Sequence, residues 1–169
     1  MTAVPCFAAD PATRARLVAE ARRWLGTPYC HQASCRGAGA DCLGLIRGIW
    51  RAVYGAEPEV PPAYAPDWGE TDGRETLLAA ASRHLRPIPI GEAGLGDVLV
   101  FRMRARGPAK HLALLATPWI EGGRIIHAYS GQAVCETHLG SAWLRRCAGT
   151  FRYPAAHLRS DDNRPIGRD

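Results

Sequence analysis

A cysteine at the start of an apolar helical pattern is the residue of this sequence best placed to do chemistry. Asp41 precedes Cys42 and is a good N-cap, because its carboxylate accepts bonds from the first-turn amides. Ile46, Ile49 and Val53 follow at helical spacing, which puts the thiol on the buried face. The positive end of the helix dipole favours thiolate. The pattern predicts a nucleophile, with a small buried apolar residue as the alternative.

Two histidines on consecutive expected strands are the candidate partners of this thiol. His111 opens the apolar run from Lys110 to Thr117, and His127 lies in the next run, from Gly123 to Tyr129. A turn rich in glycine joins the runs, which predicts an antiparallel hairpin. Other histidines lie on a solvated helix face or at element ends and have no supporting pattern: His84, His138 and His157.

The register of this hairpin decides whether the two imidazoles meet. If Thr117 pairs with Gly123, Ala113 falls opposite His127, and His111 is its diagonal neighbour on the same face. A slip of one residue would send the two rings to opposite faces. In the first register one ring orients the other, as base and orienting residue of a Cys-His-X triad. Taken singly, each histidine is equally well explained as a polar residue at a strand edge.

Length and composition indicate one globular domain. The chain has 169 residues, 47% of them hydrophobic and 22% charged, and no apolar run is long enough for a membrane span. We expect residues 1–159 to form a single domain and residues 160–169 a polar tail. The net charge of +5 comes from scattered arginines, with Lys110 the only lysine. This distribution argues against a nucleic-acid partner and suits a substrate that carries carboxylates.

Cysteine usage and the first ten residues indicate the compartment. The segment from Met1 to Asp10 has no basic stretch followed by an apolar core, so we expect synthesis in the cytoplasm without a signal peptide. The six cysteines are therefore expected to be free thiols, Cys30 and Cys35 among them. Cys30, His31 and Cys35 lack the second half of a metal motif, so we expect no metal and no membrane insertion.

The order of the expected elements predicts an α+β fold, with helices first and an antiparallel meander after them. A proline-rich connection follows the second helix. The expected helices are 11–25, 42–54 (closed by Gly55) and 74–85; the expected loops are Tyr29–Ala40 and Glu57–Asp72; the expected strands are Val98–Phe101, Lys110–Thr117, Gly123–Tyr129, Ala133–Thr137 and Thr150–Tyr153.

Several motifs, in this order, resemble the NlpC/P60 family of papain-like cysteine peptidases. They span about residues 14–153: Trp24–Tyr29, Asp41–Leu45, Gly96–Phe101, His111–Leu114 and Ile125–Ala128. The resemblance implies the papain-like NlpC/P60 fold, in which N-terminal helices pack on an antiparallel sheet. The run from His31 to Ser34, with Gly37–Gly39 and the Leu43 variant, resembles the phage-encoded branch that includes peptidases of gene transfer agents.

The family's roles fall on matching positions. Cys42 would be the nucleophile, His111 the general base and His127 the orienting residue. Tyr29, with the Cys42 amide, would hold the oxyanion, and Asp41 would belong to the same substrate-binding region. The resemblance implies hydrolysis of peptidoglycan stem peptides, typically after γ-D-glutamate, without a cofactor.

The sequence also departs from the family pattern. Leu43 replaces the usual serine after the nucleophile. Cys30-His31-Gln32 replaces an aromatic-glycine segment, so the family pattern does not assign the substrate subsite at these three residues. Trp68 and Trp119 are expected either to line a groove or to pack locally.

The phage-like resemblance implies tail hub or tip proteins as partners and a virion tail or gene transfer agent particle as the location. We expect the proline-rich connection and the polar tail to dock there. Two other functions stay open: a structural tail-tip component with a vestigial peptidase fold, and an amidase or acyltransferase on the same scaffold.

Overall fold

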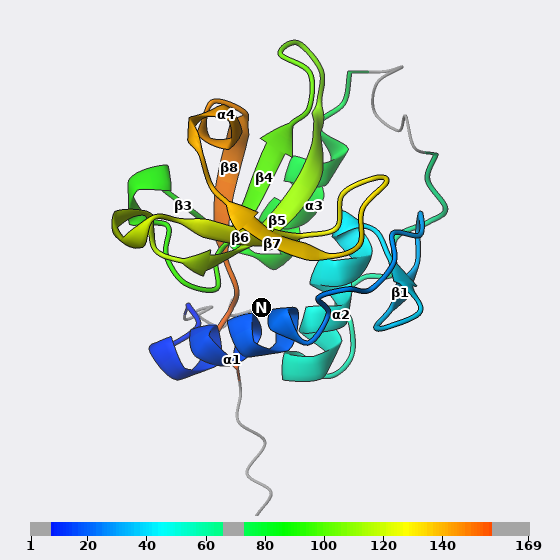
Figure 1. Ribbon diagram of the computed structural model, residues 1–169, viewed down its shortest axis with the longest axis horizontal. Coiled ribbons are helices and arrows are strands. Elements are labelled where there is room, and N and C mark those ends of the chain that lie inside the picture. The colour runs from blue at the N-terminus through cyan, green and yellow to red at the C-terminus, as the bar shows by residue number, and fades with distance from the viewer. Residues whose placement is uncertain (1–7, 66–72, 157–169) are drawn as a thin grey trace, which may run out of the picture.

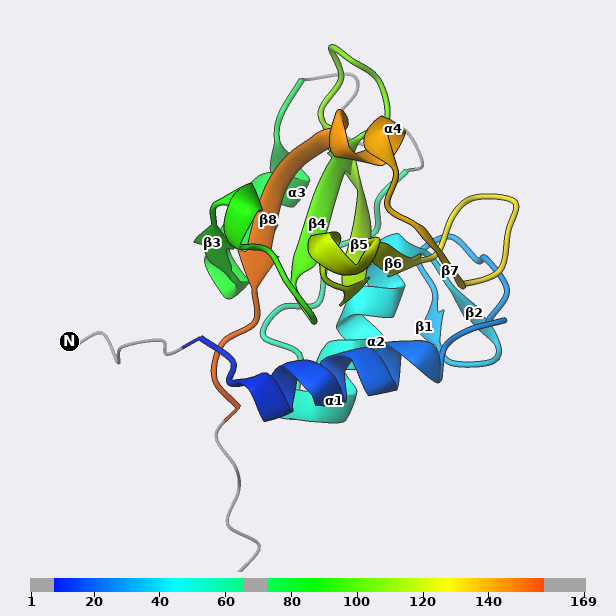
Figure 2. The same cartoon turned by 60° about the vertical axis from the view of Figure 1, so that its left-hand side comes forward.

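A six-stranded antiparallel sheet with three helices on one face forms the centre of the fold (Figures 1 and 2). The computed structural model describes residues 8–65 and 73–156. Trp68, His157 and the 160–169 tail therefore lie outside the described residues. The predicted α+β class is confirmed. Within the two described ranges, every helix is too short or too polar to cross a bilayer.

Two of the three long helices begin close to where local signals place them. Asp10 caps α1 (Pro11–Arg22) by accepting the Thr13 amide at 2.8 Å. This helix ends at Arg22 rather than near Leu25, because the next amides bond carbonyls three residues back. The second helix, α2 (Cys42–Tyr54), has the predicted bounds, and α3 (Thr76–His84) is shorter at both ends than expected.

The sheet contains the predicted strands in the order β3-β8-β4-β5-β6-β7. The meander β4-β5-β6-β7 is as expected, but β8 then returns to pair with β4 on the other side. The sequence pattern did not predict β3, because Pro87 marks an edge strand with few ladder bonds. The strands are β3 (Arg86–Ile88), β4 (Val98–Arg102), β5 (Ala109–Thr117), β6 (Arg124–His127), β7 (Cys135–His138) and β8 (Cys147–Arg152).

The central strands bury both of their faces. Alternate residues such as Val98 and Leu112 pack with α1, α2 and α3, whereas Leu99 and Ala113 face a second apolar cluster. A short helix, α4 (Ser141–Leu144), adds side chains to that second cluster, on the far side of the sheet from α1 (Figure 2). The sheet is therefore a middle layer whose two faces differ in what covers them.

The predicted loop from Tyr29 to Ala40 is wrong in part, because it contains a small hairpin. Strands β1 (Ser34–Cys35) and β2 (Gly39–Ala40) pair in antiparallel fashion. Ala40 also exchanges main-chain bonds with Pro28 and Cys30, at 3.0 and 3.1 Å. Strands of two residues are too short to show an alternation in sequence. The hairpin leads directly into α2 and so helps to place its first turn.

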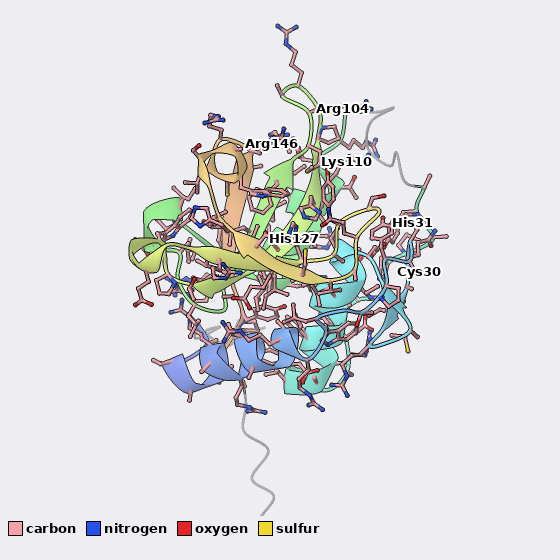
Figure 3. All side chains as sticks on the ribbon, in the orientation of Figure 1. Cys30, His31, Arg104, Lys110, His127 and Arg146 are labelled. Atoms are coloured by element: carbon pink, nitrogen blue, oxygen red, sulfur yellow. The ribbon has the colours of Figure 1, made fainter. Side chains whose placement is uncertain are left out.

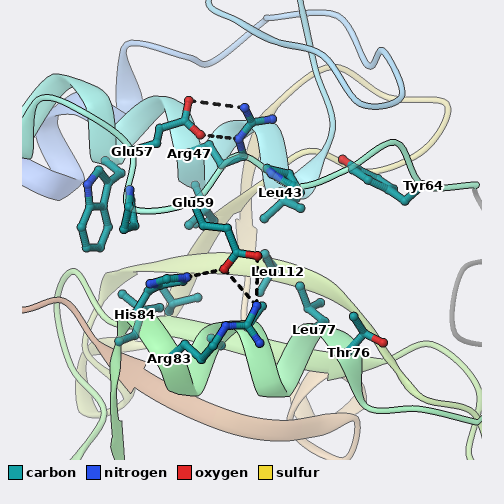
Figure 4. Close-up of a pocket in the computed structure, with 18 of the residues that line it drawn as sticks. Leu43, Arg47, Glu57, Glu59, Tyr64, Thr76, Leu77, Arg83, His84 and Leu112 are labelled. Carbon is teal, nitrogen blue, oxygen red and sulfur yellow. Dashed lines mark hydrogen bonds and ion pairs between the residues drawn. The ribbon is translucent and has the colours of Figure 1, made fainter.

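The described part of the proline-rich connection is a strap that packs on the chain itself. Glu57 binds Arg47 at 2.6 Å and also pairs with Arg51, both on α2. Glu59 reaches α3, where its carboxylate contacts Arg83 and His84 at 2.9 and 2.6 Å (Figure 4). His84 thus contacts a carboxylate rather than being simply solvated. The strap, residues 57–65, ties two helices together next to the candidate site.

Candidate active site

Cys42 is the first residue of α2, and the predicted cap is confirmed. The Asp41 carboxylate accepts the Gly44 amide at 2.7 Å and is itself buried. Gly44 allows the hairpin to approach closely, since a Cβ there would lie 1.8 Å from the Ala33 carbonyl oxygen. The helix start is therefore held on two sides.

The Cys42 thiol is half-buried against the main chain of β5. Its Sγ lies 3.8 Å from the Lys110 carbonyl oxygen. Burial, followed by the nearby Asp41 carboxylate, raises the pKa of the Cys42 thiol to about 12, and amides of Leu112, Leu43 and Cys42 only partly oppose this. The helix terminus favours thiolate, but desolvation outweighs this effect, so the pKa of the Cys42 thiol lies above its usual value.

The two candidate histidines meet as predicted. Leu114 pairs with Ile126, and Leu115 pairs with Ile125, in the register that brings the rings together. An irregularity beyond Leu115 shifts the partner of Thr117 from the expected Gly123 to Arg124.

A direct hydrogen bond joins the two rings. The His111 Nε2 and His127 Nδ1 atoms are 2.9 Å apart, and both side chains are buried, with 5% and 3% of their surface exposed. The one-residue slip that would have separated them does not occur.

A threonine extends this pair into a chain of hydrogen bonds. The Thr137 hydroxyl on β7 lies 3.1 Å from Nε2 of His127. Two proton arrangements satisfy both bonds, running in opposite directions along the chain. In one, His127 donates to Thr137 and accepts from His111, which leaves a lone pair on Nδ1 of His111. Only that arrangement equips His111 to accept a proton.

Aromatic rings enclose the histidine pair. Trp143 of α4 stacks on His111 with ring centroids 5.5 Å apart and meets His127 edge-on at 5.2 Å. Phe101 and Tyr129 also contact His111. Burial, with a smaller contribution from His127, lowers the pKa of His111 to about 3, and burial lowers that of His127 to about 4. Both imidazoles are neutral at physiological pH.

The Cys42 thiol reaches β5 from α2, whereas the His111 imidazole projects from β5 itself. Leu112 packs with the helices, whereas His111 contacts Phe101 of the second cluster, so its ring projects from the other face. Cys42 reaches the strand edge between these faces, where β6 no longer pairs with β5. Among the described residues no hydrogen bond joins Cys42 to His111. In substrate-free enzymes such bonds are often long and shorten in the complex.

A cavity of about 230 Å³ opens over the thiol, and both predicted oxyanion or substrate-binding residues belong to it. Tyr29 and Asp41 line it together with Cys42, Tyr64 and Lys110. Burial, then the nearby charges of Cys42 and Asp41, raises the pKa of the Tyr29 hydroxyl, so it is a proton donor at neutral pH.

The segment that departs from the family pattern forms one wall of this cavity. His31 Nε2 and the side-chain nitrogen Nε2 of Gln32 lie 2.7 and 2.8 Å from the Tyr64 carbonyl oxygen. The Tyr64 hydroxyl in turn donates to Asp41 at 2.5 Å. The first two contacts bind the strap to residues 31–32, and the third binds it to Asp41, the residue that caps α2.

A second, mainly apolar cavity of about 200 Å³ lies beneath the strap (Figure 4). It shares Leu43, Tyr64 and Leu77 with the cavity over the thiol. Leu43, the residue that departs from the family pattern, therefore borders both spaces.

Some functional candidates were not found from the sequence. Thr137 lies two residues along β7 from the partner of His127, which a strand alternation could have suggested. Trp143 lies in a four-residue helix that gives no periodic signal. Trp119 does not line a groove: its indole donates to the Ala93 carbonyl at 2.9 Å in the second cluster. Cys30 and Cys35 are exposed free thiols.

Solved structures share this fold. An NlpC/P60 family lipoprotein-like protein from Staphylococcus aureus matches 90% of this chain and 45% of its own, with 22% identity and a TM-score of 0.57. The NlpC/p60 domain of the peptidoglycan hydrolase SagA matches 82% of this chain and 97% of its own, with 24% identity and a TM-score of 0.54. A Bacillus cereus NlpC/P60 family protein gives a TM-score of 0.58 at 20% identity, over 83% of this chain and 40% of that one. The chain therefore has the NlpC/P60 fold.

A curated relative adds a sequence likeness. The γ-DL-glutamyl hydrolase of Bacillus subtilis (strain 168) is 26% identical over 149 residues, which is 87% of this chain. The chain spans about a third of that protein, 31% of its length. No family model matches the chain.

Proposed function

We propose that this domain hydrolyses stem peptides of peptidoglycan, after γ-D-glutamate, as a cysteine peptidase. The observation that carries the proposal is the chain of hydrogen bonds from Thr137 through His127 to His111, which ends next to the strand edge where the Cys42 thiol lies. The fold shared with NlpC/P60 structures and the likeness to a γ-DL-glutamyl hydrolase support the substrate class.

Acylation begins from a neutral pair, given the raised pKa of Cys42 and the lowered pKa of His111. As Sγ bonds to the substrate's carbonyl carbon, its proton passes to Nδ1 of His111. In this scheme the Cys42 amide and the Tyr29 hydroxyl, which border the same cavity, donate to the oxyanion. His111 then protonates the leaving amine, the C–N bond breaks, and a thioester is left on Cys42.

Deacylation reverses these roles with water in place of the amine. His111 takes a proton from water, whose oxygen attacks the thioester carbon. The C–S bond breaks, and the proton returns to sulfur. Burial makes the imidazolium a strong acid in both steps, which favours rapid protonation of each leaving group.

Digestion of purified peptidoglycan tests this proposal directly. The wild-type chain should release fragments whose masses place the cut after γ-D-glutamate. Cys42→Ala and Cys42→Ser should lose this activity and keep the fold by circular dichroism. Cys30→Ser, which alters an exposed thiol outside the proposed triad, serves as the matched control. Near-native release by Cys42→Ala would remove the nucleophile assignment.

The same assays separate the alternative functions. A vestigial structural component would neither cut peptidoglycan nor react at Cys42 with an acylating activity probe. An amidase or acyltransferase would react with the probe but release a different product, with another bond cut or the acyl group transferred to an added amine. The intact His111–His127 bond favours an active site over a vestigial one.

We further propose delivery by a phage-like tail tip. The support is the resemblance of the His31–Ser34 run and Leu43 to the phage-encoded branch. Purified particles should contain this chain in stoichiometric amounts at the tail end. A chain found only free in lysates, and absent from washed particles, would refute this delivery and leave the peptidase proposal intact.

A further inference from the structure

Most arginines of the described chain are neutralised by a carboxylate. Salt bridges join arginines of α1, α2, α3, three strands and two connections to glutamates or to Asp97. Within residues 8–65 and 73–156, five exposed arginines form no such bridge: Arg16, Arg86, Arg106, Arg145 and Arg146. Arg16 and Arg86 lie apart, on α1 and β3, whereas the other three belong to two segments that meet.

Arg106, Arg145 and Arg146 belong to segments that lie together at one end of the sheet. Phe101 pairs with both His111 and Cys147, which brings the turn after β4 next to the junction between α4 and β8. The Arg102 amide donates to the Arg146 carbonyl at 2.8 Å across that contact. Figure 3 shows Arg104 and Arg146 at this end.

We call Arg106, Arg145 and Arg146 the arginine patch. The two segments that carry it, residues 103–108 and 139–147, contain no acidic side chain. A ligand approaching this end of the sheet therefore meets positive charge that neither segment offsets.

The patch borders the candidate active site. Trp143, which stacks on His111, precedes Arg145 by two residues in the same helix and its cap. Lys110, which lines the cavity over Cys42, lies shortly after the turn that carries Arg106. A chain that extends from the thiol past the histidines would therefore meet the patch next.

We propose that the arginine patch binds the carboxylates of an extended γ-glutamyl peptide on one side of the bond that is cut. The inference rests on the proposed function. A γ-linked glutamate keeps its α-carboxylate free, so such a chain presents anions along its length. Guanidinium groups bind carboxylates in bidentate fashion, and their field in an exposed position raises the local concentration of an anionic substrate.

Binding of poly-γ-glutamate to a chain with Cys42→Ala tests the patch without turnover. In this background Arg145→Gln/Arg146→Gln removes two charges from the patch. Arg16→Gln/Arg86→Gln is the matched control, because it removes two exposed charges that form no salt bridge, from α1 and β3. We expect calorimetry at low salt to show about tenfold weaker binding for the patch variant and nearly unchanged binding for the control.

Activity then separates the inference from the function on which it rests. With Cys42 restored, the patch variant should lose about tenfold in kcat/KM on poly-γ-glutamate and keep its rate on a short uncharged γ-glutamyl amide. Equal losses in the patch and control variants would overturn the inference. Patch-dependent binding of RNA or anionic vesicles, with none of poly-γ-glutamate, would also overturn it. If the patch binds poly-γ-glutamate but the wild-type chain cuts neither this polymer nor purified peptidoglycan, the patch is supported and the hydrolase proposal is removed.

Discussion

His111 contacts His127 through Nε2, at 2.9 Å from Nδ1 of its partner, and this choice of atoms decides what His111 can do. With Nε2 engaged, Nδ1 is the ring nitrogen left to serve the proposed nucleophile, Cys42. A base that acts through Nδ1 needs its proton on Nε2, and His127 is placed to accept it. The bond therefore specifies a tautomer as well as an orientation.

Acidification should destabilise the fold before carboxylates protonate. The pKa values of His111 and His127 are about 3 and 4 when folded, against about 6.5 when unfolded. The unfolded chain thus binds more protons below pH 6.5, so the free energy of unfolding falls as pH falls. Each ring contributes about 1.4 kcal/mol per pH unit between 6.5 and 4.5.

Thermal unfolding of wild type and variants at pH 7 and pH 4.5 checks this linkage. His127→Phe should lose less stability on acidification than wild type, because one buried titrating group is gone. His138→Gln, which alters an exposed ring, should behave like wild type. Equal acid sensitivity in all three proteins would contradict the lowered histidine pKa values.

Alkylation of Cys42 should keep accelerating far into the alkaline range. Because the pKa of its thiol is about 12, the reactive thiolate is scarce at neutral pH and increases with each pH unit. Iodoacetamide labelling with peptide mapping should show no plateau for Cys42 up to pH 10. The exposed Cys30 provides an internal comparison in the same sample. A plateau near pH 8 would indicate a thiolate already favoured by the helix terminus.

Local signals were sufficient to predict the helix that begins at Cys42 and its cap. Asp41, the apolar stripe and Gly55 all act within one segment, and the helix has the predicted bounds. The meeting of His111 and His127 required a register, which the apolar alternation on the two strands specified. These parts of the site follow from nearby residues, so the sequence predicts them.

Contacts between distant segments could not be predicted in the same way. The high pKa of Cys42 arises because the thiol is buried at the edge of β5, which the helix-terminus argument did not include. Trp143 covers the histidines from a helix of only four residues. The strap reaches Asp41 through the Tyr64 hydroxyl, a side-chain contact with no sequence period.

Gly44→Ala should destabilise the start of α2. A Cβ at this position would lie 1.8 Å from the carbonyl oxygen of Ala33, so the hairpin or the helix must move. Overpacking of this kind costs about 1–3 kcal/mol, and here it also disturbs the Asp41 cap. Urea unfolding should report the loss, with Gly91→Ala as a control that meets no atom within 4 Å. Unchanged stability in Gly44→Ala would contradict the close approach.

Thr137 should act on the reaction through His127, as a positioning residue. In the productive arrangement its hydroxyl accepts the proton of His127 Nε2, which keeps the lone pair of His127 Nδ1 toward His111. Thr137→Val removes the acceptor at nearly constant shape and should lower kcat about tenfold, with little change in KM. Thr137→Ser should restore activity, and nitrogen chemical shifts of the two rings should show that only the valine variant populates the other tautomer. Thr150→Val, which removes a hydroxyl bonded to the Ile88 carbonyl on the same sheet, controls for stability. A valine variant with wild-type kcat and unchanged ring shifts would show that the histidine pair holds its tautomer without Thr137.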